Sequence, residues 1–509
     1  MGDLPRITAT ATQALTLGVQ SSWPDHHFQG RPVLPAVEAM QILAARMRAD
    51  RPTLDVHTIS NARFPKFLAI APDRDSVETR CETTDQEDGG VQTALTSNVT
   101  VGAARIRRSV THAELCFGGT VAPLPPMPLD LLAAMEGICT NVDPEVIYRE
   151  LVPFGPRFRS ICRPLVISAD GALARVRAPA HADAYPGPLG SGFPLDGAFH
   201  AACVWGQRFA RRVAFPVAIA RRRILIPTRS DATYTARVVP VTVDAAQLIV
   251  DIWILDGAGN LCEAALGVAM RDVSRGAWQP PDWIVENQPD VDPGAWTGNC
   301  RGIVIMERDH LADFAAVALT SAETQRLAGM GNKRKTGYIA GRLALKRLWR
   351  KLADNGHQRP STTIETVVDD ASRPCLPAAD NAPPMYAALS HDDRFCVAVA
   401  HDTPVGIDVE PICARALRAQ HLFMDASEQA RVKVAAMDNA AAALRVWSIK
   451  EAAAKTLDMA LVDAWERIRV IRIGDEESRF ENNGGKVTTA RHTTVEGHLI
   501  TLVTDVGSG

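Results

Sequence analysis

The run VGIDVE at 405–410 and the run WSIKEAAAK at 447–455 decide the fold of the C-terminal part of this chain. The first run has strand character, and Asp408 and Glu410 stand two apart in it. Both carboxylates therefore project from one face of a strand. The second run lies inside a longer helical pattern, NAAAALRVWSIKEAAAKTL (439–457). Helix and strand are therefore mixed in this part, and we predict an α+β fold.

The helical run adds a third acid to the two on the strand. Glu451 and Lys455 are four apart and share one face of a helix. Three acids that converge from a strand and a helix bind a hard cation through oxygen atoms. Magnesium with retained waters and a pyrophosphate fits that set. On this spacing alone, solvated surface acids are the alternative.

Three further blocks stand upstream of these runs, and the five together span residues 333–455. In content and order they resemble the signature blocks of the surfactin-type 4′-phosphopantetheinyl transferases. The chain departs from that family at Arg373, where lysine is usual, and at Ala388, where a polar residue is usual. The three upstream blocks are KRKTGYIAGRLALKRL (333–348), RPCLP (373–377) and ALSHDDRFCVAVA (388–400).

The resemblance implies a role for each matching residue. Asp408, Glu410 and Glu451 would hold Mg²⁺ against the pyrophosphate of coenzyme A. The serine hydroxyl of an apo acyl-carrier protein would attack the β-phosphate, and 3′,5′-ADP would leave while the cation and Lys455 neutralise the developing charge. Glu451 would help to take the serine proton. The residues that would contact the phosphates of the coenzyme are His391, Lys450, Lys455, Arg334 and Arg342.

The N-terminal part contains two apolar helix patterns, each beside a short polar motif. Pro35 opens the first pattern, PAVEAMQILAARMR, directly after the motif DHHFQGRPVLPAV (25–37). The second, LDGAFHAACVWGQRFA (195–210), precedes strand-like runs that end in a hairpin of LIVDIWIL (248–255) and LCEAALGVAM (261–270). The repeated order of elements predicts a duplicated α+β unit.

The polar motifs resemble those of polyketide synthase dehydratase domains. His26 begins the first signature, and Asp196 with His200 forms the second. Phe154 stands where a third block of that family has tyrosine. His27 is the alternative base, because the similar block of stand-alone fatty-acid dehydratases would align there. The aspartate before His26 and the helix that follows favour His26.

This second resemblance implies both a fold and a reaction. Two hotdog folds, each a sheet wrapped around a central helix, would precede a two-lobed α+β transferase domain. His26 would take the α-proton of a 3-hydroxyacyl thioester, and Asp196, or a water that it holds, would protonate the leaving hydroxyl to give a 2,3-enoyl thioester. A backbone N–H at the start of the helix over 36–48 would stabilise the thioester oxygen. Alternatively, the hotdog half is a non-catalytic module for carrier-protein docking or dimerisation.

The domain boundaries follow from a proline-rich stretch and from the motifs. Four prolines and several acids in SRGAWQPPDWIVENQPDVDPGAWT are typical of a linker. Downstream of it, Thr320 and Glu323 have the spacing of a capping box that opens a helix. The predicted domains are a first hotdog over 1–130, a second hotdog over 131–275, a linker over 276–298 and the transferase over 299–509.

Composition limits the class of protein. A net charge of −3 argues against broad nucleic-acid binding, and no run approaches the length of a membrane helix. The N-terminus shows no basic segment followed by a continuous apolar core, and the ten cysteines form no CxxC pair. We therefore expect a cytoplasmic protein with reduced thiols. The expected partners are an acyl-carrier protein, separate or within a synthase, an acyl thioester, and a second copy of the chain through the hotdog half. The acyl chain length and the pathway product are not fixed by the sequence.

Overall fold

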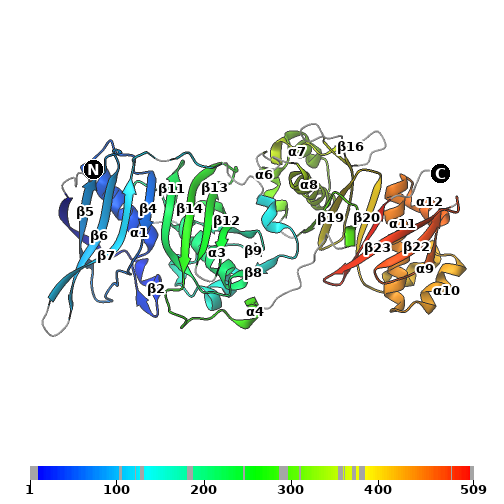
Figure 1. Ribbon diagram of the computed structural model, residues 1–509, viewed down its shortest axis with the longest axis horizontal. Helices are drawn as coiled ribbons and strands as arrows, with labels where there is room; N and C mark the ends of the chain where they lie inside the picture. The colour runs from blue at the N-terminus through cyan, green and yellow to red at the C-terminus, as the bar shows by residue number, and fades with distance from the viewer. Residues whose placement is uncertain are drawn as a thin grey trace, which may run out of the picture. The chain divides into compact units, whose positions relative to one another are not determined.

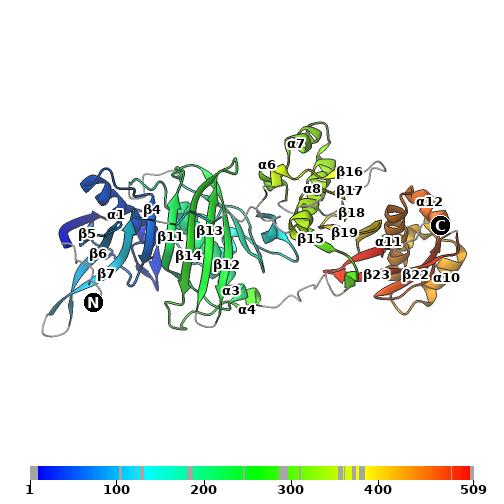
Figure 2. The same ribbon diagram turned by 45° about the horizontal axis from the view of Figure 1, so that its top comes forward.

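The chain forms two compact units, which we call the N-terminal and C-terminal units (Figures 1 and 2). The N-terminal unit comprises Met1–Pro125 and Thr140–Asn287, and the C-terminal unit comprises Pro126–Cys139 and Gln288–Gly509. A computed structural model describes residues 10–101, 106–120, 122–125, 131–179, 187–244, 247–285, 296–308, 311–353, 359, 361–368, 374–377, 385–482 and 484–504.

The N-terminal unit is built on one 12-stranded antiparallel sheet in the order β1-β5-β6-β7-β4-β11-β14-β13-β12-β10-β9-β8. The pairing of β4 with β11 joins its two halves. A separate small hairpin is formed by β2 and β3. The strands are β1 (Thr10–Gly18), β2 (His27–Phe28), β3 (Arg31–Pro32), β4 (Thr58–Arg63), β5 (Ser76–Asp85), β6 (Val91–Val101), β7 (Ile106–Phe117), β8 (Thr140–Val142), β9 (Leu165–Ser168), β10 (Gly171–Arg177), β11 (Phe215–Ile224), β12 (Thr233–Val243), β13 (Leu248–Leu255) and β14 (Leu261–Arg271).

Each half of this sheet packs around one long helix. α1 (Ala36–Asp50) begins directly after Pro35 and contacts β6 and β7. α3 (Phe193–Phe209) contacts β10, β12 and β13, and every one of its residues from Phe193 to Gln207 is buried. A helix that is apolar on all sides is stable only inside a core. Two halves of the sheet, each wrapped around its own central helix, confirm the predicted double hotdog fold.

The closing hairpin of this unit matches the sequence prediction. β13 covers Leu248–Leu255 as predicted, and β14 ends one residue beyond the predicted run. The carboxylate of Asp256 accepts hydrogen bonds from the backbone N–H groups of Ala258 and Asn260, which closes the turn. Aspartate at the start of a turn makes such local bonds readily, so this turn is readable from sequence.

The first part of the predicted linker over 276–298 is folded. Trp278 packs on Phe28 with ring centroids 4.9 Å apart, and the short helix α4 (Asp282–Val285) follows. Both belong to the N-terminal unit. Residues 286–295 lie outside the described residues.

The C-terminal unit has two lobes, each a five-stranded antiparallel sheet with a long helix. The first sheet has the order β15-β19-β18-β17-β16 and packs on α8, and the second has the order β20-β24-β23-β22-β21 and packs on α11. The predicted two-lobed α+β architecture is confirmed. The strands are β15 (Gly302–Glu307), β16 (Val367–Val368), β17 (Pro374–Leu376), β18 (Met385–His391), β19 (Phe395–His401), β20 (Val405–Pro411), β21 (Ile468–Arg472), β22 (Glu477–Asn482), β23 (Val487–Val495) and β24 (His498–Thr504).

Local signals set the ends of several helices in this unit. Thr320 accepts a hydrogen bond from the backbone of Glu323, whose carboxylate accepts one from the backbone of Thr320, so the predicted capping box opens α7. α11 has the predicted bounds and ends where Asp458 adopts a left-handed φ of 53°. The helices are α6 (Ala315–Ala318), α7 (Ser321–Ala328), α8 (Asn332–Leu352), α9 (Arg415–Phe423), α10 (Ala426–Val434), α11 (Asn439–Leu457) and α12 (Leu461–Arg467).

The segment between the two hotdogs belongs to the C-terminal unit, whereas the predicted boundaries divide it between the hotdogs. Glu136 bridges to Met306 at the free edge of β15, and the backbone N–H of Gly137 donates to the carbonyl of Ile305 at 2.8 Å. The carboxylate of Glu136 also lies 2.6 Å from Arg347 and 2.7 Å from Lys351. This segment therefore covers a sheet edge that would otherwise expose unpaired backbone groups.

Two further findings concern the whole of the described chain. None of its helices has the length and apolar character required to cross a membrane. The described cysteines are free thiols, and five of them are buried.

Candidate active sites

The first candidate site starts at the β2–β3 hairpin, which positions His26. Gln29 and Gly30 form a two-residue turn with φ of 51° and 73°, the left-handed values of a type I′ turn. The Nδ1 atom of His26 lies 3.0 Å from the carbonyl oxygen of Val33. A carbonyl only accepts, so the ring proton lies on Nδ1 and the Nε2 atom keeps its lone pair.

Asp196 and His200 lie one turn apart on α3, both buried. Asp196 Oδ2 is 3.0 Å from His200 Nε2, and neither atom makes a well-aligned hydrogen bond with a described residue. The Tyr148 hydroxyl lies 3.2 Å from His200 Nδ1 and accepts a hydrogen bond from the backbone N–H of Ile161 at 2.8 Å. The hydroxyl proton is then directed to Nδ1, which places the His200 proton on Nε2, facing Asp196.

Burial favours the neutral form of His26, which lies in the same site as Asp196. Burial lowers the pKa of His26, and the charge of Asp196 opposes this in part. Phe154, at the position where the dehydratase motif has tyrosine, stacks on His26 with centroids 4.6 Å apart and lies 5.0 Å from His200. In one apolar site, a neutral imidazole can act as a base and a protonated carboxyl group can act as an acid.

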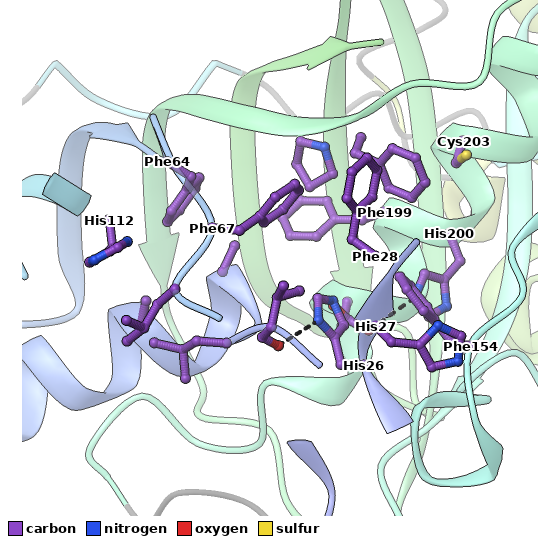
Figure 3. Close-up of a pocket in the computed structure, with 18 of the residues that line it drawn as sticks. His26, His27, Phe28, Phe64, Phe67, His112, Phe154, Phe199, His200 and Cys203 are labelled. Carbon is purple, nitrogen blue, oxygen red and sulfur yellow. Dashed lines mark hydrogen bonds and ion pairs between the residues drawn. The ribbon is translucent and has the colours of Figure 1, made fainter. Parts of the chain in front are cut away.

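These groups line a single cavity (Figure 3). His26, His27 and His200 gather at one side of it, His112 lies at the other, and aromatic rings including Phe67 lie between them. Because His27 lines the same cavity, the geometry leaves it available as the alternative base. The apolar lining suits an acyl chain.

The second candidate site is the predicted acid cluster. One carboxylate oxygen from each of Asp408, Glu410 and Glu451 lies within 4.8 Å of the others. Burial, followed by the charges of Asp408 and Glu451, raises the pKa of Glu410 to about 7. Three converging carboxylates fit a hard divalent cation.

Short side chains and a lysine hold the central acid in place. Asp408 accepts hydrogen bonds from Ser390 at 3.0 Å and from Ser448 at 2.7 Å. Lys455 donates to the carbonyl of Ile407 at 2.7 Å, and its ammonium lies 3.4 Å from Asp408 and also 3.4 Å from Glu451. Lys455 therefore lies at the acid cluster.

A basic cavity adjoins the cluster through Glu410. It is lined by Arg334 and Arg342 from α8 and by His391 from β18, the residues expected to contact the phosphates of the coenzyme. Gly337 allows this approach, because a Cβ atom there would lie 2.8 Å from the His391 ring. Burial lowers the pKa of His391. The cavity can hold phosphate groups next to the acid cluster.

Lys450 does not join this site, contrary to the prediction. Its ammonium is buried and donates to Glu428 at 2.9 Å and to the carbonyls of Phe423 and Trp465 at 2.6 and 3.1 Å. All three of its N–H groups are used. Adjacent residues point about 100° apart around a helix, so Lys450 faces the core while Glu451 faces the acid cluster. Arg373 lies outside the described residues.

Several site residues escaped the sequence analysis. Tyr148 is isolated in sequence and reaches His200 only through packing. Arg308 and Arg415 line the basic cavity from the end of β15 and the start of α9. Their one sequence signal is a basic residue at the end of a predicted element, which many surface arginines share. Ser448 lies within a predicted helix, and its hydrogen bond to Asp408 depends on the meeting of strand and helix.

Family models match both units. The model described as "Polyketide synthase dehydratase N-terminal domain" matches residues 128–280, and that of the "4'-phosphopantetheinyl transferase superfamily" matches residues 404–503. The chain therefore joins a region matched by the dehydratase model to a region matched by the phosphopantetheinyl transferase model, and we call it the fusion. The dehydratase match begins at residue 128, so the first hotdog of the fusion is assigned from its own geometry.

Solved structures similar to the fusion are polyketide synthase dehydratase domains. One, from a mycocerosic acid synthase-like synthase, is 16% identical over 53% of this chain and 97% of its own, with a TM-score of 0.39. Another, from a trans-AT synthase of Brevibacillus brevis, is 18% identical over 52% and 93%, with a TM-score of 0.41. The domain from the CurF module of curacin synthase is 16% identical over 53% and 95%, with a TM-score of 0.42. No curated protein matches the fusion.

Proposed function

We propose that the fusion first primes and then processes an acyl-carrier protein in the cytoplasm. The C-terminal site transfers 4′-phosphopantetheine from coenzyme A to a serine of the apo carrier. The N-terminal site converts a 3-hydroxyacyl thioester on a carrier to a 2,3-enoyl thioester. The observation that carries the proposal is the three-carboxylate cluster directly beside a basic cavity. The dehydratase activity rests on His26 beside Asp196 in an apolar cavity.

In the transferase reaction, the residues of the acid cluster and the basic cavity hold opposite ends of one ligand. Asp408, Glu410 and Glu451 would hold Mg²⁺, which when bound neutralises the pyrophosphate. The arginines of α8 and His391 bind the remaining phosphates. Lys455 places positive charge next to the reacting phosphate. Glu451 takes the serine proton while the serine oxygen bonds to the β-phosphate and the bond to 3′,5′-ADP breaks.

In the dehydration, the hydrogen-bond partners of His26 and His200 support the following proton transfers. The free Nε2 of His26 takes the α-proton of the thioester. Asp196, or a water that it holds, gives a proton to the β-hydroxyl, which leaves as water as the double bond forms. The Nε2–H of His200 then faces the resulting carboxylate. Ala36, at the start of α1, lines the cavity, which supports a backbone N–H there as the donor to the thioester oxygen.

The intact mass of a carrier protein tests both activities. The fusion is incubated with apo carrier, Mg²⁺ and 3-hydroxybutyryl-coenzyme A, and the carrier mass is followed over time. We expect a gain of the acyl-phosphopantetheine mass followed by a loss of one water. Asp408→Ala should block the gain, and His26→Ala should block only the loss.

Matched variants make this result specific. Asp463→Ala removes an exposed carboxylate of α12 and should leave loading unchanged. His27→Ala should leave dehydration active; if it blocks dehydration while His26→Ala does not, the base is His27. Loading without loss of water on several hydroxyacyl chains would show the hotdog half to be a non-catalytic docking or dimerisation module. No loading of any carrier would refute the transferase proposal.

A further inference from the structure

The far end of the β6–β7 hairpin leaves the sheet. β5 pairs with β6 only as far as Thr96, and β4 pairs with β7 only from Glu114 onward. Residues 97–101 and 106–110 therefore pair only with each other among the described residues, and they project beyond the sheet in both views (Figures 1 and 2). We call them the ribbon arm. A bare two-stranded ribbon is of marginal stability in water, so a bound partner would stabilise it.

The ribbon arm has a local positive charge. Arg107 and Arg108 are exposed and adjacent in a strand, so they point to opposite faces of the ribbon. The sequence from 97 to 110 contains no acidic residue, although the whole chain has a net charge of −3. Val99 lies opposite Arg108 and is 38% exposed. An exposed apolar side chain beside arginines that form no ion pair among the described residues suits an acidic protein surface.

The base of the ribbon arm reaches the dehydratase cavity. The pairing register of β6 and β7 shifts there, so that His112 is the extra residue of a β-bulge. His112 lines the cavity, and its Nε2 lies 2.7 Å from the Ser97 hydroxyl, at the start of the arm (Figure 3). Arg108 is four residues along the same strand, or roughly 13 Å from His112 at 3.3 Å per residue. The arm therefore connects its exposed arginines to the cavity.

We propose that the ribbon arm binds an acidic acyl-carrier protein while the thioester of that carrier enters the dehydratase cavity. This inference rests on the proposed dehydratase function. Guanidinium groups on both ribbon faces pair with carboxylates of the carrier and steer its approach. The covalent tether of the substrate spans the distance from the arm to the cavity.

The test compares the rate of dehydration of one acyl group on a carrier protein and on free pantetheine. Dehydration of 3-hydroxybutyryl groups is measured on a purified acyl-carrier protein and on free pantetheine, at low and at high salt. Arg107→Glu with Arg108→Glu should raise KM for the carrier-bound substrate about tenfold, since rim charges act mainly on association. Turnover of the pantetheine thioester should stay unchanged. Arg107→Lys with Arg108→Lys should keep most of the carrier activity.

A matched control makes the same charge change elsewhere on the unit. Arg74 and Arg229 are exposed, and Arg74→Glu with Arg229→Glu should leave both KM values unchanged. The inference is overturned if the arm variant keeps the wild-type KM for the carrier-bound substrate, or if its activity falls equally on the carrier-bound and the pantetheine substrates. It is also overturned if the variant converts a dimer to a monomer, because the arm would then join two copies of the chain.

Failure of the proposed function is a distinct result. If the wild type does not dehydrate even the pantetheine thioester, the dehydratase proposal is wrong. Direct binding of fluorescently labelled carrier to the full chain then tests the arm independently. About tenfold weaker binding by the arm variant would support carrier docking, and equal binding would refute it.

Discussion

Tyr148 provides a sharp test of how the dehydratase site is organised. Its hydroxyl accepts a hydrogen bond from the backbone N–H of Ile161 and lies 3.2 Å from His200 Nδ1, with the side chain buried. Burial raises the pKa of Tyr148, so the hydroxyl stays protonated. Tyr148→Phe removes this hydroxyl and keeps the ring, whose centroid lies 5.6 Å from that of His200.

Two losses of different kind follow from this substitution. The buried N–H of Ile161 loses its acceptor, which should lower the free energy of unfolding by about 1–3 kcal/mol. His200 loses the donor that keeps its proton on Nε2, so its alignment with Asp196 is no longer fixed. Misalignment of a catalytic group typically slows turnover by about tenfold to a hundredfold. We expect kcat to fall within that range with little change in KM, because Tyr148 does not line the cavity.

Tyr234→Phe is the matched control in the same unit. The buried Tyr234 hydroxyl accepts a hydrogen bond from the backbone N–H of Arg229 at 2.7 Å, without a catalytic neighbour among the lining residues. Both variants should lose comparable stability in denaturant titrations, and only Tyr148→Phe should lose kcat on a hydroxyacyl thioester. Carrier loading by the same samples should be unaffected. Equal kcat for the two variants would refute the positioning role of Tyr148.

Other predictions concern the transferase. Lys450→Met leaves the buried Glu428 carboxylate without its ion-pair partner and should lower the free energy of unfolding by about 3–5 kcal/mol. Lys455→Met should instead abolish carrier loading with little change in stability. Thermal melts and the mass of the carrier distinguish the two effects. Glu136→Ala removes the acid shared by two basic residues of α8 and should lower the free energy of unfolding by about 1 kcal/mol, measured in denaturant. Burial lowers the pKa of His492 to about 3. As the pH falls below about 6.5, His492 therefore becomes protonated in the unfolded state but not in the folded state. The free energy of unfolding should then fall by about 1.4 kcal/mol per pH unit down to about pH 3. His492→Gln should flatten that slope.

Each of these predictions has an outcome that contradicts it. Wild-type stability of Lys450→Met would place its ammonium outside the core, and full loading by Lys455→Met would remove that lysine from the site. An unchanged melt of Glu136→Ala would show that its segment does not stabilise the C-terminal unit. An unchanged pH dependence in His492→Gln would assign the acid sensitivity to other groups.

The sequence alone determined the local elements and the motifs. The capping box at Thr320 and the turn at Asp256 form within a few residues, so their geometry depends on side chains adjacent in sequence. α11 and β13 have the predicted bounds because apolar periodicity and flanking polar residues fix both type and length. The spacing within one strand and one helix also sets which acids share a face, whereas their convergence at one cation was expected from the resemblance to the transferase family.

Only the tertiary structure decided how these elements meet. Tyr148 joins His200 across two elements, and no local pattern relates them. Lys450 stands next to Glu451 in sequence, yet the helices packed on one side of α11 bury the lysine and leave the acid at the site. The segment that contains Glu136 pairs with a strand about 170 residues later. A side chain's neighbours depend on which surfaces bury apolar area together, and that choice belongs to the whole chain.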